Sequence, residues 1–260
     1  MAVLTMDTST QALSAALGKD GQTLASAVSL IPRGHSRLLQ PMLQHLLQSA
    51  GWTPMDLTAV AVGMGPGSYT GVRLAVATAK ALATTLSIPV IPIPTLAALA
   101  EAAYPGESLC TTYVMPLMYA RRERAFGAIF AKTGVKWVCV EDTQVLQVSS
   151  WMDKLQKLVA AGDGTRTAVL HDFNGRSDLA SKTALEKARS WVDTVLELCS
   201  VAADIGPAMV RIAGRQDFGC TPRNGEDIHA LVPDYALRVE AEVKQSEGSS
   251  VDGTGGNVQS

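Results

Sequence analysis

The feature that most constrains the fold is a glycine-rich loop between an apolar run and a nearly uncharged helix. Residues 57–63 predict a strand, and the loop at 65–71 follows it. Residues 70–87 then carry only two charged side chains, Arg73 and Lys80, among alanines, valines and leucines. A helix that is apolar around its whole circumference has no face left for water. We therefore expect its own domain to cover one side and a second molecule to cover another, where outward-facing alanines permit close approach.

A second helix with surplus apolar surface is predicted between residues 35 and 50. Its leucines and Met42 fall within about half of the circumference at 3.6 residues per turn, and the other half holds Arg37, His45 and glutamines. We expect Pro41 to kink this helix, or the helix to become regular only after it. An arc this wide, opposite a row with almost no charge, favours an interface. The predicted partner surface comprises Leu38, Met42, His45, Leu46, Val72, Arg73, Ala75, Val76, Ala79, Lys80 and Ala83.

Composition excludes several classes of protein. A hydrophobic content of 47% supports a substantial core. The formal net charge of -2 argues against holding nucleic acid by bulk electrostatics. The four cysteines form no CxxC pair, so neither a zinc site nor a disulfide framework is indicated. Reduced thiols, together with the lack of a signal-peptide pattern or an apolar run that spans a bilayer, predict a cytoplasmic protein.

The predicted elements fall into two series with the same order. The first series is a meander of three strands, followed by a helix, a strand, a helix, a strand and a further helix. The second series is weaker, and a long helix, interrupted at Gly206-Pro207, then returns to the first half. Strands are predicted at 2–6, 12–17, 23–30, 57–63, 88–94, 109–117, 124–132, 137–148 and 168–171, and helices at 35–50, 70–87, 95–103, 151–161 and 192–213.

This order predicts an α/β fold of two RNase H-like subdomains, each a mixed β-sheet flanked by helices. Actin and the sugar kinases share that architecture (the ASKHA fold), and their nucleotide phosphates lie between the two halves. We assign residues 1–104 and 192–214 to the first subdomain and residues 105–191 to a degenerate second one. Residues 215–245 form a C-terminal extension. Residues 246–260 are rich in Gly, Ser, Thr and Asn without periodicity, which predicts a disordered tail.

The glycine-rich loop is a candidate phosphate site. Gly65, Gly67, Ser68 and Thr70 stand at a strand-to-helix junction, where backbone amides and the helix dipole favour anions. The loop lacks the Lys-Ser/Thr pair of a Walker loop, and Thr70 replaces the third glycine of the dinucleotide fingerprint. The favoured alternative is that the glycines permit a tight turn and close helix packing. Arg73, one turn into the helix, is the nearest basic side chain.

A second candidate is the hydroxyl-rich turn after the first strand. Asp7, Thr8, Ser9 and Thr10 could bind Mg²⁺ or phosphate at the mouth of a cleft between the subdomains, as in actin-like ATPases. The alternative is a turn whose side chains bond to its own backbone. The residue types leave both readings open.

No catalytic constellation emerges from the remaining residues. His35 and His45 are ten residues apart, and the other two histidines, His171 and His229, are isolated, so no HxxxH metal pair exists. There is no GxSxG elbow and no cysteine near a sequence-local histidine. We therefore predict no catalytic residue, no metal site and no cofactor for this chain alone. The most basic run, residues 121–124, could be a solvated hairpin end or could touch RNA phosphate or a partner carboxylate.

These residues resemble the bacterial TsaB (YeaZ) family. The motifs that carry the resemblance are residues 3–10, His35-Ser36 with residues 38–41, and above all Gly65-Pro66-Gly67-Ser68-Tyr69-Thr70-Gly71-Val72-Arg73. The match covers residues 1 to about 100 well and continues more loosely through 116–122, 202–206 and 231–238. Arg37 stands where the family usually has Glu, Tyr119 where it usually has Asp, and residues 171–175 replace a glycine-rich turn.

The resemblance implies a noncatalytic subunit of the complex that makes threonylcarbamoyladenosine at position 37 of ANN-decoding tRNAs. TsaD would hold the metal and transfer the carbamoyl group, TsaE would hydrolyse ATP, and this chain would pair with TsaD through its N-terminal helices or with a second copy when alone. The binding of tRNA, ATP and Mg²⁺ would be a property of the complex rather than of this chain alone. On this reading, we expect Ala79→Arg to leave the chain folded and to abolish pairing. The rival reading is an ATP-dependent transferase or metallopeptidase-like enzyme of the same fold.

Overall fold

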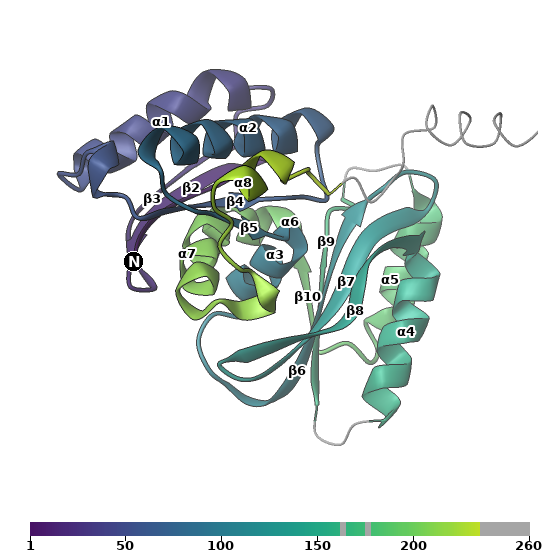
Figure 1. Ribbon diagram of the computed structural model, residues 1–260. Coiled ribbons are helices and arrows are strands. Elements are labelled where there is room, and N and C mark those ends of the chain that lie inside the picture. Colours follow the sequence, from purple (N-terminus) through teal and green to yellow (C-terminus); the bar gives the residue numbers. More distant parts are fainter. Residues whose placement is uncertain (162–164, 175–177, 235–260) are drawn as a thin grey trace, which may run out of the picture.

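The computed structural model describes residues 1–161, 165–174 and 178–234, and shows two α/β subdomains (Figure 1). The first sheet has the order β3-β2-β1-β4-β5, in which β1 to β3 are antiparallel and β4 and β5 run parallel to β1. Every residue of β4 is buried, as its uninterrupted apolar sequence predicts. The strands are β1 (Ala2–Asp7), β2 (Leu13–Lys19), β3 (Gln22–Ser29), β4 (Ala59–Gly63) and β5 (Val90–Ile93).

The second sheet has the order β10-β9-β6-β7-β8 and is also mixed. Strands β6, β9 and β10 are parallel, and β7 is antiparallel to both β6 and β8. The prediction of two mixed sheets flanked by helices is thus confirmed. The strands are β6 (Ser108–Tyr119), β7 (Arg124–Gly134), β8 (Lys136–Gln147), β9 (Arg166–His171) and β10 (Thr194–Glu197).

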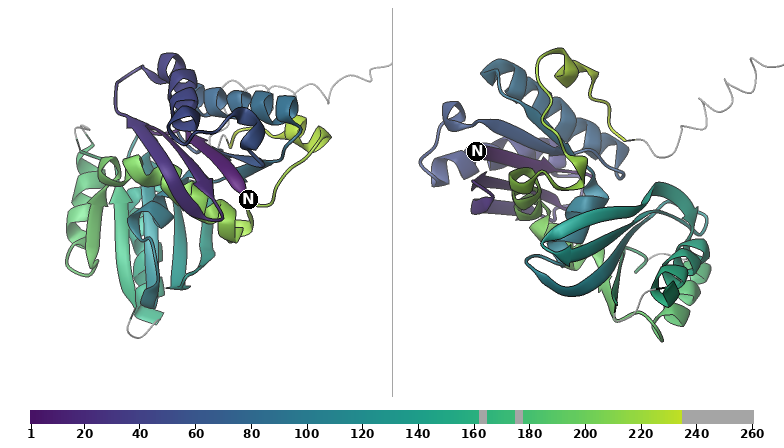
Figure 2. Two further views of the ribbon diagram at one scale, coloured as in Figure 1. Left: turned by 90° about the vertical axis from the view of Figure 1, so that its left-hand side faces the viewer. Right: turned by 60° about the horizontal axis from the view of Figure 1, so that its bottom comes forward.

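The helices form three layers around the two sheets (Figures 1 and 2). Helices α1 (His35–Ser49) and α2 (Tyr69–Leu86) cover the outer face of the first sheet. Helices α3 (Thr95–Ala103) and α7 (Ile205–Arg215) lie between the sheets and join one continuous apolar core. Helices α4 (Val148–Ala161) and α5 (Leu179–Ala188) cover the far face of the second sheet. None of the described helices is both long and apolar enough to cross a bilayer.

The long helix predicted at 192–213 is wrong in its first half. Residues 194–197 form β10 at the edge of the second sheet, α6 (Leu198–Val201) and a 3-10 turn follow, and α7 begins at Ile205. The carboxylate of Asp193 accepts hydrogen bonds from the Thr167 backbone N–H (2.7 Å) and hydroxyl (2.9 Å), which fixes the start of β10 beside β9. Residues 194–197 therefore belong to the second sheet rather than to the first subdomain.

Other differences concern the helices. The sequence did not predict α5 or α8 (Glu226–Ala230). The alternative that α1 becomes regular only after Pro41 is wrong, because α1 is helical from His35 and Pro41 lies inside it with an exposed side chain. The predicted disordered tail, residues 246–260, lies outside the described residues, as does the extension beyond residue 234.

A buried ion cluster joins the two subdomains. Glu101, on α3, is fully buried and accepts hydrogen bonds from Arg211 Nε (2.6 Å) and Trp137 Nε1 (2.7 Å). The same carboxylate lies 2.9 Å from Arg215 Nη2 and 3.4 Å from Lys132 Nζ. Burial alone would raise the pKa of Glu101, but these hydrogen bonds and positive charges outweigh it and hold that pKa below its ordinary value. Because Lys132 and Trp137 belong to β7 and β8, Glu101 anchors the second sheet to the central helices.

The chain after α7 returns across the first subdomain as a strap, residues 216–234. Arg223 exchanges both backbone hydrogen bonds with Val90 on β5, at 3.0 and 2.7 Å. Ile228 of α8 is buried in the apolar cluster of α1 and α2, and Lys80 Nζ donates to the His229 carbonyl at 2.9 Å. The backbone N–H of Asp234 donates to the Met64 carbonyl at 2.8 Å. The strap therefore covers one flank of α2 and the free edge of β5.

Candidate functional site

The turn after β1 forms a buried polar cluster. The Asp7 carboxylate accepts hydrogen bonds from the Ser9 backbone N–H (2.8 Å), the Thr95 hydroxyl (2.8 Å) and the Ser9 hydroxyl (3.2 Å). Burial raises the pKa of Asp7 above its ordinary value, even though these hydrogen bonds favour the charged form. All the polar side chains of this cluster are bonded to one another or to nearby backbone, which is the self-bonded turn rather than an open Mg²⁺ site.

The glycine-rich loop packs directly against this turn. The Ser68 N–H donates to the Ser9 carbonyl (2.8 Å), Gly71 N–H to the Ser68 hydroxyl (3.3 Å), and Gly65 N–H to the Thr95 hydroxyl (3.1 Å). These three amides are therefore used within the chain rather than left open for a bound phosphate. A Cβ at position 67 would lie 2.3 Å from the Ser9 carbonyl oxygen, so Gly67 serves close backbone packing. Thr70 is exposed in the first turn of α2, and Thr8 donates to the Gly71 carbonyl at 2.5 Å.

The raised pKa of Asp7 predicts how stability changes with pH. Because the folded chain binds this proton more tightly than the unfolded chain, the free energy of unfolding should fall as pH rises through the folded-state pKa. Asp7→Asn removes the titrating group while keeping its shape. Urea unfolding between pH 4 and pH 7, at about one-unit steps, should show the advantage of the wild type over Asp7→Asn shrinking as pH rises. A pH-independent difference would show that burial does not govern this carboxyl.

The predicted partner surface is only partly exposed. His45 and Arg73 are exposed and Leu38, Met42 and Lys80 are half-buried, whereas the following are buried: Leu46, Val72, Ala75, Val76, Ala79 and Ala83. The prediction that the alanines face outward is therefore wrong for Ala75, Ala79 and Ala83, which are buried in the apolar cluster that α2 shares with the first sheet, α1 and Ile228 of α8. The expectation that Ala79→Arg leaves the chain folded fails for the same reason, because the arginine would enter the chain's own core.

The surface that α1 and α2 do expose is an open groove between them, with a volume of about 540 Å³. We call it the α1/α2 groove. Its walls are Gln40, Gln44 and Gln48 on α1 and Leu82 on α2, and its floor reaches Leu4 of β1. No side chain that lines it in the described part of the chain is charged. The other lining residues, most of which sequence reasoning did not single out, are Pro41, Leu43, Leu47, Trp52, Thr53, Pro54 and Leu57.

Two exposed alanines of α2 lie close in sequence to Leu82, the residue of α2 that lines the groove. Ala77 and Ala81 are exposed at i and i+4, so they share one face of the helix. Trp52, half-buried just beyond α1, is the residue that could have indicated the groove from the sequence, since a large aromatic after an apolar helix needs a covering surface. Arg37, a departure from the family pattern, is exposed on α1.

A smaller cavity of about 120 Å³ lies between the subdomains. Thr10 and Gln11 line it from the first subdomain, and Met118, His171 and Glu197 line it from the second. His171 is buried and stacks on Phe173 at 5.2 Å; burial lowers its pKa, although nearby Glu197 opposes the shift. No lysine or arginine lines the cavity among the described residues. Its lining does not provide the positive charge that a nucleotide phosphate requires.

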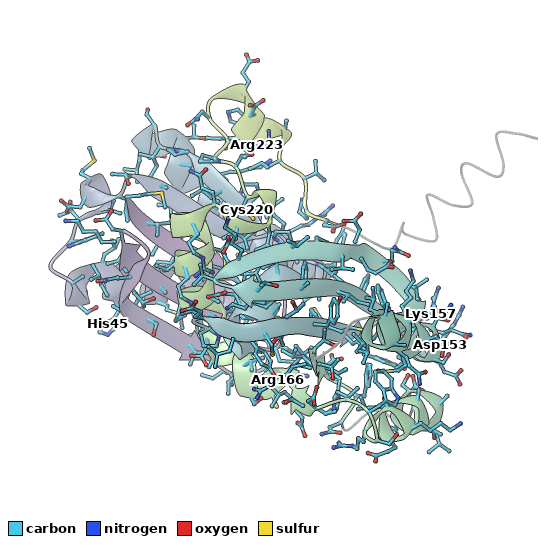
Figure 3. The ribbon with its side chains drawn as sticks, turned by 90° about the horizontal axis from the view of Figure 1, so that it is seen from below. His45, Asp153, Lys157, Arg166, Cys220 and Arg223 are labelled. Atoms are coloured by element: carbon cyan, nitrogen blue, oxygen red, sulfur yellow. The ribbon has the colours of Figure 1, made fainter. Side chains whose placement is uncertain are left out.

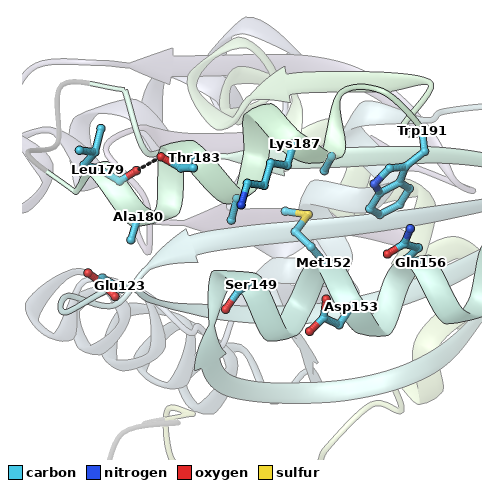
Figure 4. A pocket seen from close by; sticks show the side chains of 12 residues that line it. Glu123, Ser149, Met152, Asp153, Gln156, Leu179, Ala180, Thr183, Lys187 and Trp191 are labelled. Carbon is cyan, nitrogen blue, oxygen red and sulfur yellow. Dashed lines mark hydrogen bonds between the residues drawn. The ribbon is translucent and has the colours of Figure 1, made fainter.

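The four histidines lie on α1, β9 and α8. His35 contacts the Gln11 carbonyl at 3.2 Å, and His45 and His229 are exposed on α1 (Figure 3) and α8. The described residues contain no group of three or more side chains able to hold a metal ion. A further groove of about 680 Å³ separates α4 from α5 (Figure 4), with Glu123, Asp153 and Lys187 beside apolar Met152 and Trp191. This mixed lining singles out no ligand class.

Comparisons with known proteins agree with one another. Residues 29–203 match the family model of TsaD, tRNA N6-adenosine threonylcarbamoyltransferase. The tRNA threonylcarbamoyladenosine biosynthesis protein TsaB of Bacillus subtilis (strain 168) is 30% identical over 251 residues, which cover 95% of this chain and 99% of the relative. TsaB of Escherichia coli (strain K12) is 34% identical over 160 residues, 61% of this chain and 68% of that protein.

The solved structures support the same fold. YeaZ from Pseudomonas aeruginosa superposes with a TM-score of 0.67 at 24% identity, covering 90% of this chain and 99% of that one. An uncharacterized protein with similarity to peptidase YEAZ, from the same organism, gives a TM-score of 0.69 at 22% identity, covering 91% of this chain and 99% of that one. At these identities the likeness establishes the architecture of both subdomains.

Proposed function

Because the chain belongs to the TsaB (YeaZ) family of tRNA threonylcarbamoyladenosine biosynthesis proteins, we propose that it acts as a noncatalytic subunit that pairs with TsaD. The observation that carries this proposal is the α1/α2 groove, an uncharged and largely apolar surface on an otherwise charged protein. Apolar surface that is rimmed by uncharged polar side chains suits a protein–protein interaction site. The match of residues 29–203 to the TsaD model supports a partner with related helices.

The proposed contact is a helix bundle. A helix of TsaD would lie in the groove, its side chains reaching Leu43, Leu47 and Leu82, while Gln40, Gln44 and Gln48 would form an uncharged rim. Glutamine amides can hydrogen-bond to a partner without the desolvation cost of a charge. In the absence of TsaD, the same surface would join two copies of this chain.

Two observations support a noncatalytic role. The amides of Gly65, Ser68 and Gly71 in the loop are bonded within the chain, and the described residues offer no metal-ligand cluster. We therefore assign ATP, Mg²⁺, the metal and the contact with tRNA to the complex with TsaD and TsaE, in the cytoplasm. The alternative is an ATP-dependent transferase or a metallopeptidase-like enzyme. Tight binding of Mg–ATP by the isolated chain, together with turnover, would overturn the noncatalytic assignment.

The groove makes a sharp prediction for Ala81→Arg. Ala81 is exposed, and arginine is nearly as good a helix former as alanine, so the change in unfolding free energy should stay within about 0.5 kcal/mol. Burying the new charge against TsaD should weaken binding at least about 30-fold, which corresponds to roughly 2 kcal/mol. Titration calorimetry with purified TsaD measures this directly.

The matched control is Ala160→Arg, at an exposed alanine on α4 of the second subdomain. It should leave both stability and TsaD affinity unchanged. Full affinity in Ala81→Arg would reject the groove as the interface. In a reconstitution with TsaD and TsaE, threonylcarbamoyladenosine formation should depend on this chain and should fall with Ala81→Arg. Modification that proceeds equally well without the chain would overturn the proposed function.

A further inference from the structure

The turn between β6 and β7 holds three consecutive residues in a conformation that favours glycine. The φ angles of Arg121, Arg122 and Glu123 are 67°, 50° and 62°. Left-handed backbone is unfavourable for residues that carry a Cβ, and such residues persist only where the surrounding structure fixes them. Strained positions of this kind concentrate at functional sites. We call residues 120–124 the arginine turn.

The surroundings of the arginine turn fix it firmly. The Asp178 carboxylate, 8% exposed, accepts a hydrogen bond from Glu123 N–H at 3.1 Å. The same carboxylate caps α5 through the N–H and hydroxyl of Ser181, at 3.1 and 2.9 Å. The Glu123 carbonyl in turn accepts a hydrogen bond from Val148 N–H, at the start of α4, at 3.0 Å. Two helix N-termini therefore hold the turn in one shape.

The arginines of this turn are available for a ligand. Arg121 and Arg122 are exposed and Arg124 is half-buried. Across residues 1–161, 165–174 and 178–234, no carboxylate pairs with any of these three guanidinium groups. On a chain with a net charge of -2, the turn carries three arginines and one glutamate, Glu123, which is a local excess of positive charge.

The position of the turn limits what its ligand can be. Glu123 of the arginine turn lines the groove between α4 and α5, and no residue of the turn lines the cavity between the subdomains. The cavity is only about 120 Å³, and the carboxylate of Glu197 lines it without a basic neighbour. A nucleoside triphosphate neither fits this volume nor finds positive charge inside it. An anion that reaches the turn therefore approaches from the outer surface.

We propose that Arg121 and Arg122 bind backbone phosphates of RNA when the chain is in its complex with TsaD. The planar guanidinium group of arginine matches the geometry of phosphate oxygens. Because the backbone of the turn is already held in one shape, little conformational entropy is lost on binding. This inference rests on the proposed function, which supplies an RNA substrate. Two arginines would position the RNA on the complex without holding it alone.

The test is the salt dependence of tRNA binding by the complex of this chain with TsaD. Arg121→Gly with Arg122→Gly should reduce the slope of log affinity against log salt by about 2, and should weaken binding at low salt at least about tenfold. Glycine adopts positive φ without strain, so the same variant should unfold about 2–4 °C higher. A fluorescently labelled tRNA transcript in 50–200 mM KCl, about the range where the slope is well defined, is the probe.

The matched control removes two charges elsewhere. Arg33 is exposed with a φ of 57°, and Arg166 is exposed at the far end of β9 (Figure 3), so Arg33→Gly with Arg166→Gln reproduces the loss of charge. It should leave the slope unchanged. An equal loss of affinity in the control, or no loss in the arginine-turn variant, would overturn the inference. If the arginine-turn variant instead binds free ATP more weakly and binds tRNA normally, the turn is a nucleotide site and the inference is also rejected.

These results separate the inference from the proposed function. The arginine turn lies on the second subdomain, whereas the α1/α2 groove lies on the first, so the glycine variant should bind TsaD with wild-type affinity. If no complex with TsaD forms even with the wild type, the proposed function fails. If the complex forms but its tRNA binding ignores the arginine turn, only this inference fails.

Discussion

Glu101→Gln is expected to lower the free energy of unfolding by about 3–5 kcal/mol. The substitution keeps the volume of the side chain but removes the negative charge at the centre of the ion cluster. Lys132, 1% exposed, would remain buried with Arg211 and Arg215 nearby and no carboxylate between them. An uncompensated buried charge is among the most costly defects in a folded protein. Urea denaturation followed by Trp fluorescence measures the loss.

Two comparisons make this result decisive. Glu186→Gln removes an exposed ion pair with Arg189, at 2.9 Å, and should change stability by less than about 1 kcal/mol. Replacing both Glu101 and Lys132 by methionine should recover part of the loss, because the fully buried charge of Lys132 is removed together with its partner. If Glu101→Gln were as mild as Glu186→Gln, the cluster would not be the anchor between the subdomains.

The same cluster predicts sensitivity to acid. The folded-state pKa of Glu101 is lowered, so its contribution to stability is complete above the unfolded-state pKa and is lost as pH falls through the folded-state pKa. This direction is opposite to that of Asp7, whose pKa is raised. The two carboxyls therefore contribute separately to the dependence of the unfolding free energy on pH. Glu101→Gln should reduce the loss of stability that accompanies a fall in pH.

Gly71→Ala is expected to cost about 3 kcal/mol or more. A Cβ at position 71 would lie 1.9 Å from the Thr8 carbonyl oxygen, a distance that neither backbone segment can relieve by a rotamer change. The first turn of α2 would have to move away from the turn after β1, breaking the hydrogen bonds from Thr8 to Gly71 and from Ser68 to Ser9. Thermal unfolding monitored by circular dichroism reports the loss.

Gly51→Ala is the control for this substitution. Its φ is 67°, but no atom lies within 4 Å of the new Cβ, so only the backbone penalty of about 1–2 kcal/mol applies. The excess loss in Gly71→Ala isolates the steric contact. Equal losses in the two variants would mean that α2 can shift freely, and the glycines would then serve flexibility rather than close packing.

The sequence predicted the architecture well where periodicity is local. The strands β1 to β3 and the helices α1 to α3 appear within a few residues of their predicted bounds, because their apolar patterns are strong and their turns contain Gly and Pro. Residues 194–197 were misassigned because a four-residue strand has no period to distinguish it from the helix that follows.

The candidate site was harder to predict, because segments distant in the sequence decide which of its residues are buried. An apolar helix face reveals that something covers it, but not which molecule does: α8, some 150 residues further along the chain, takes the place assigned to a partner. Glu101 escaped notice because its partners come from three other elements, with Arg211 separated from it by 110 positions. No local pattern encodes such a cluster.

The backbone pairing of Arg223 with Val90 has a consequence for assembly. A free strand edge is a template on which another chain can extend the sheet, and proteins commonly cover such edges to avoid uncontrolled association. Here the strap satisfies the hydrogen-bonding groups of Val90 at the β5 edge. Joining two molecules into one continuous sheet is thereby blocked on this side. At this edge, a second molecule would meet the strap rather than the unpaired backbone of Val90.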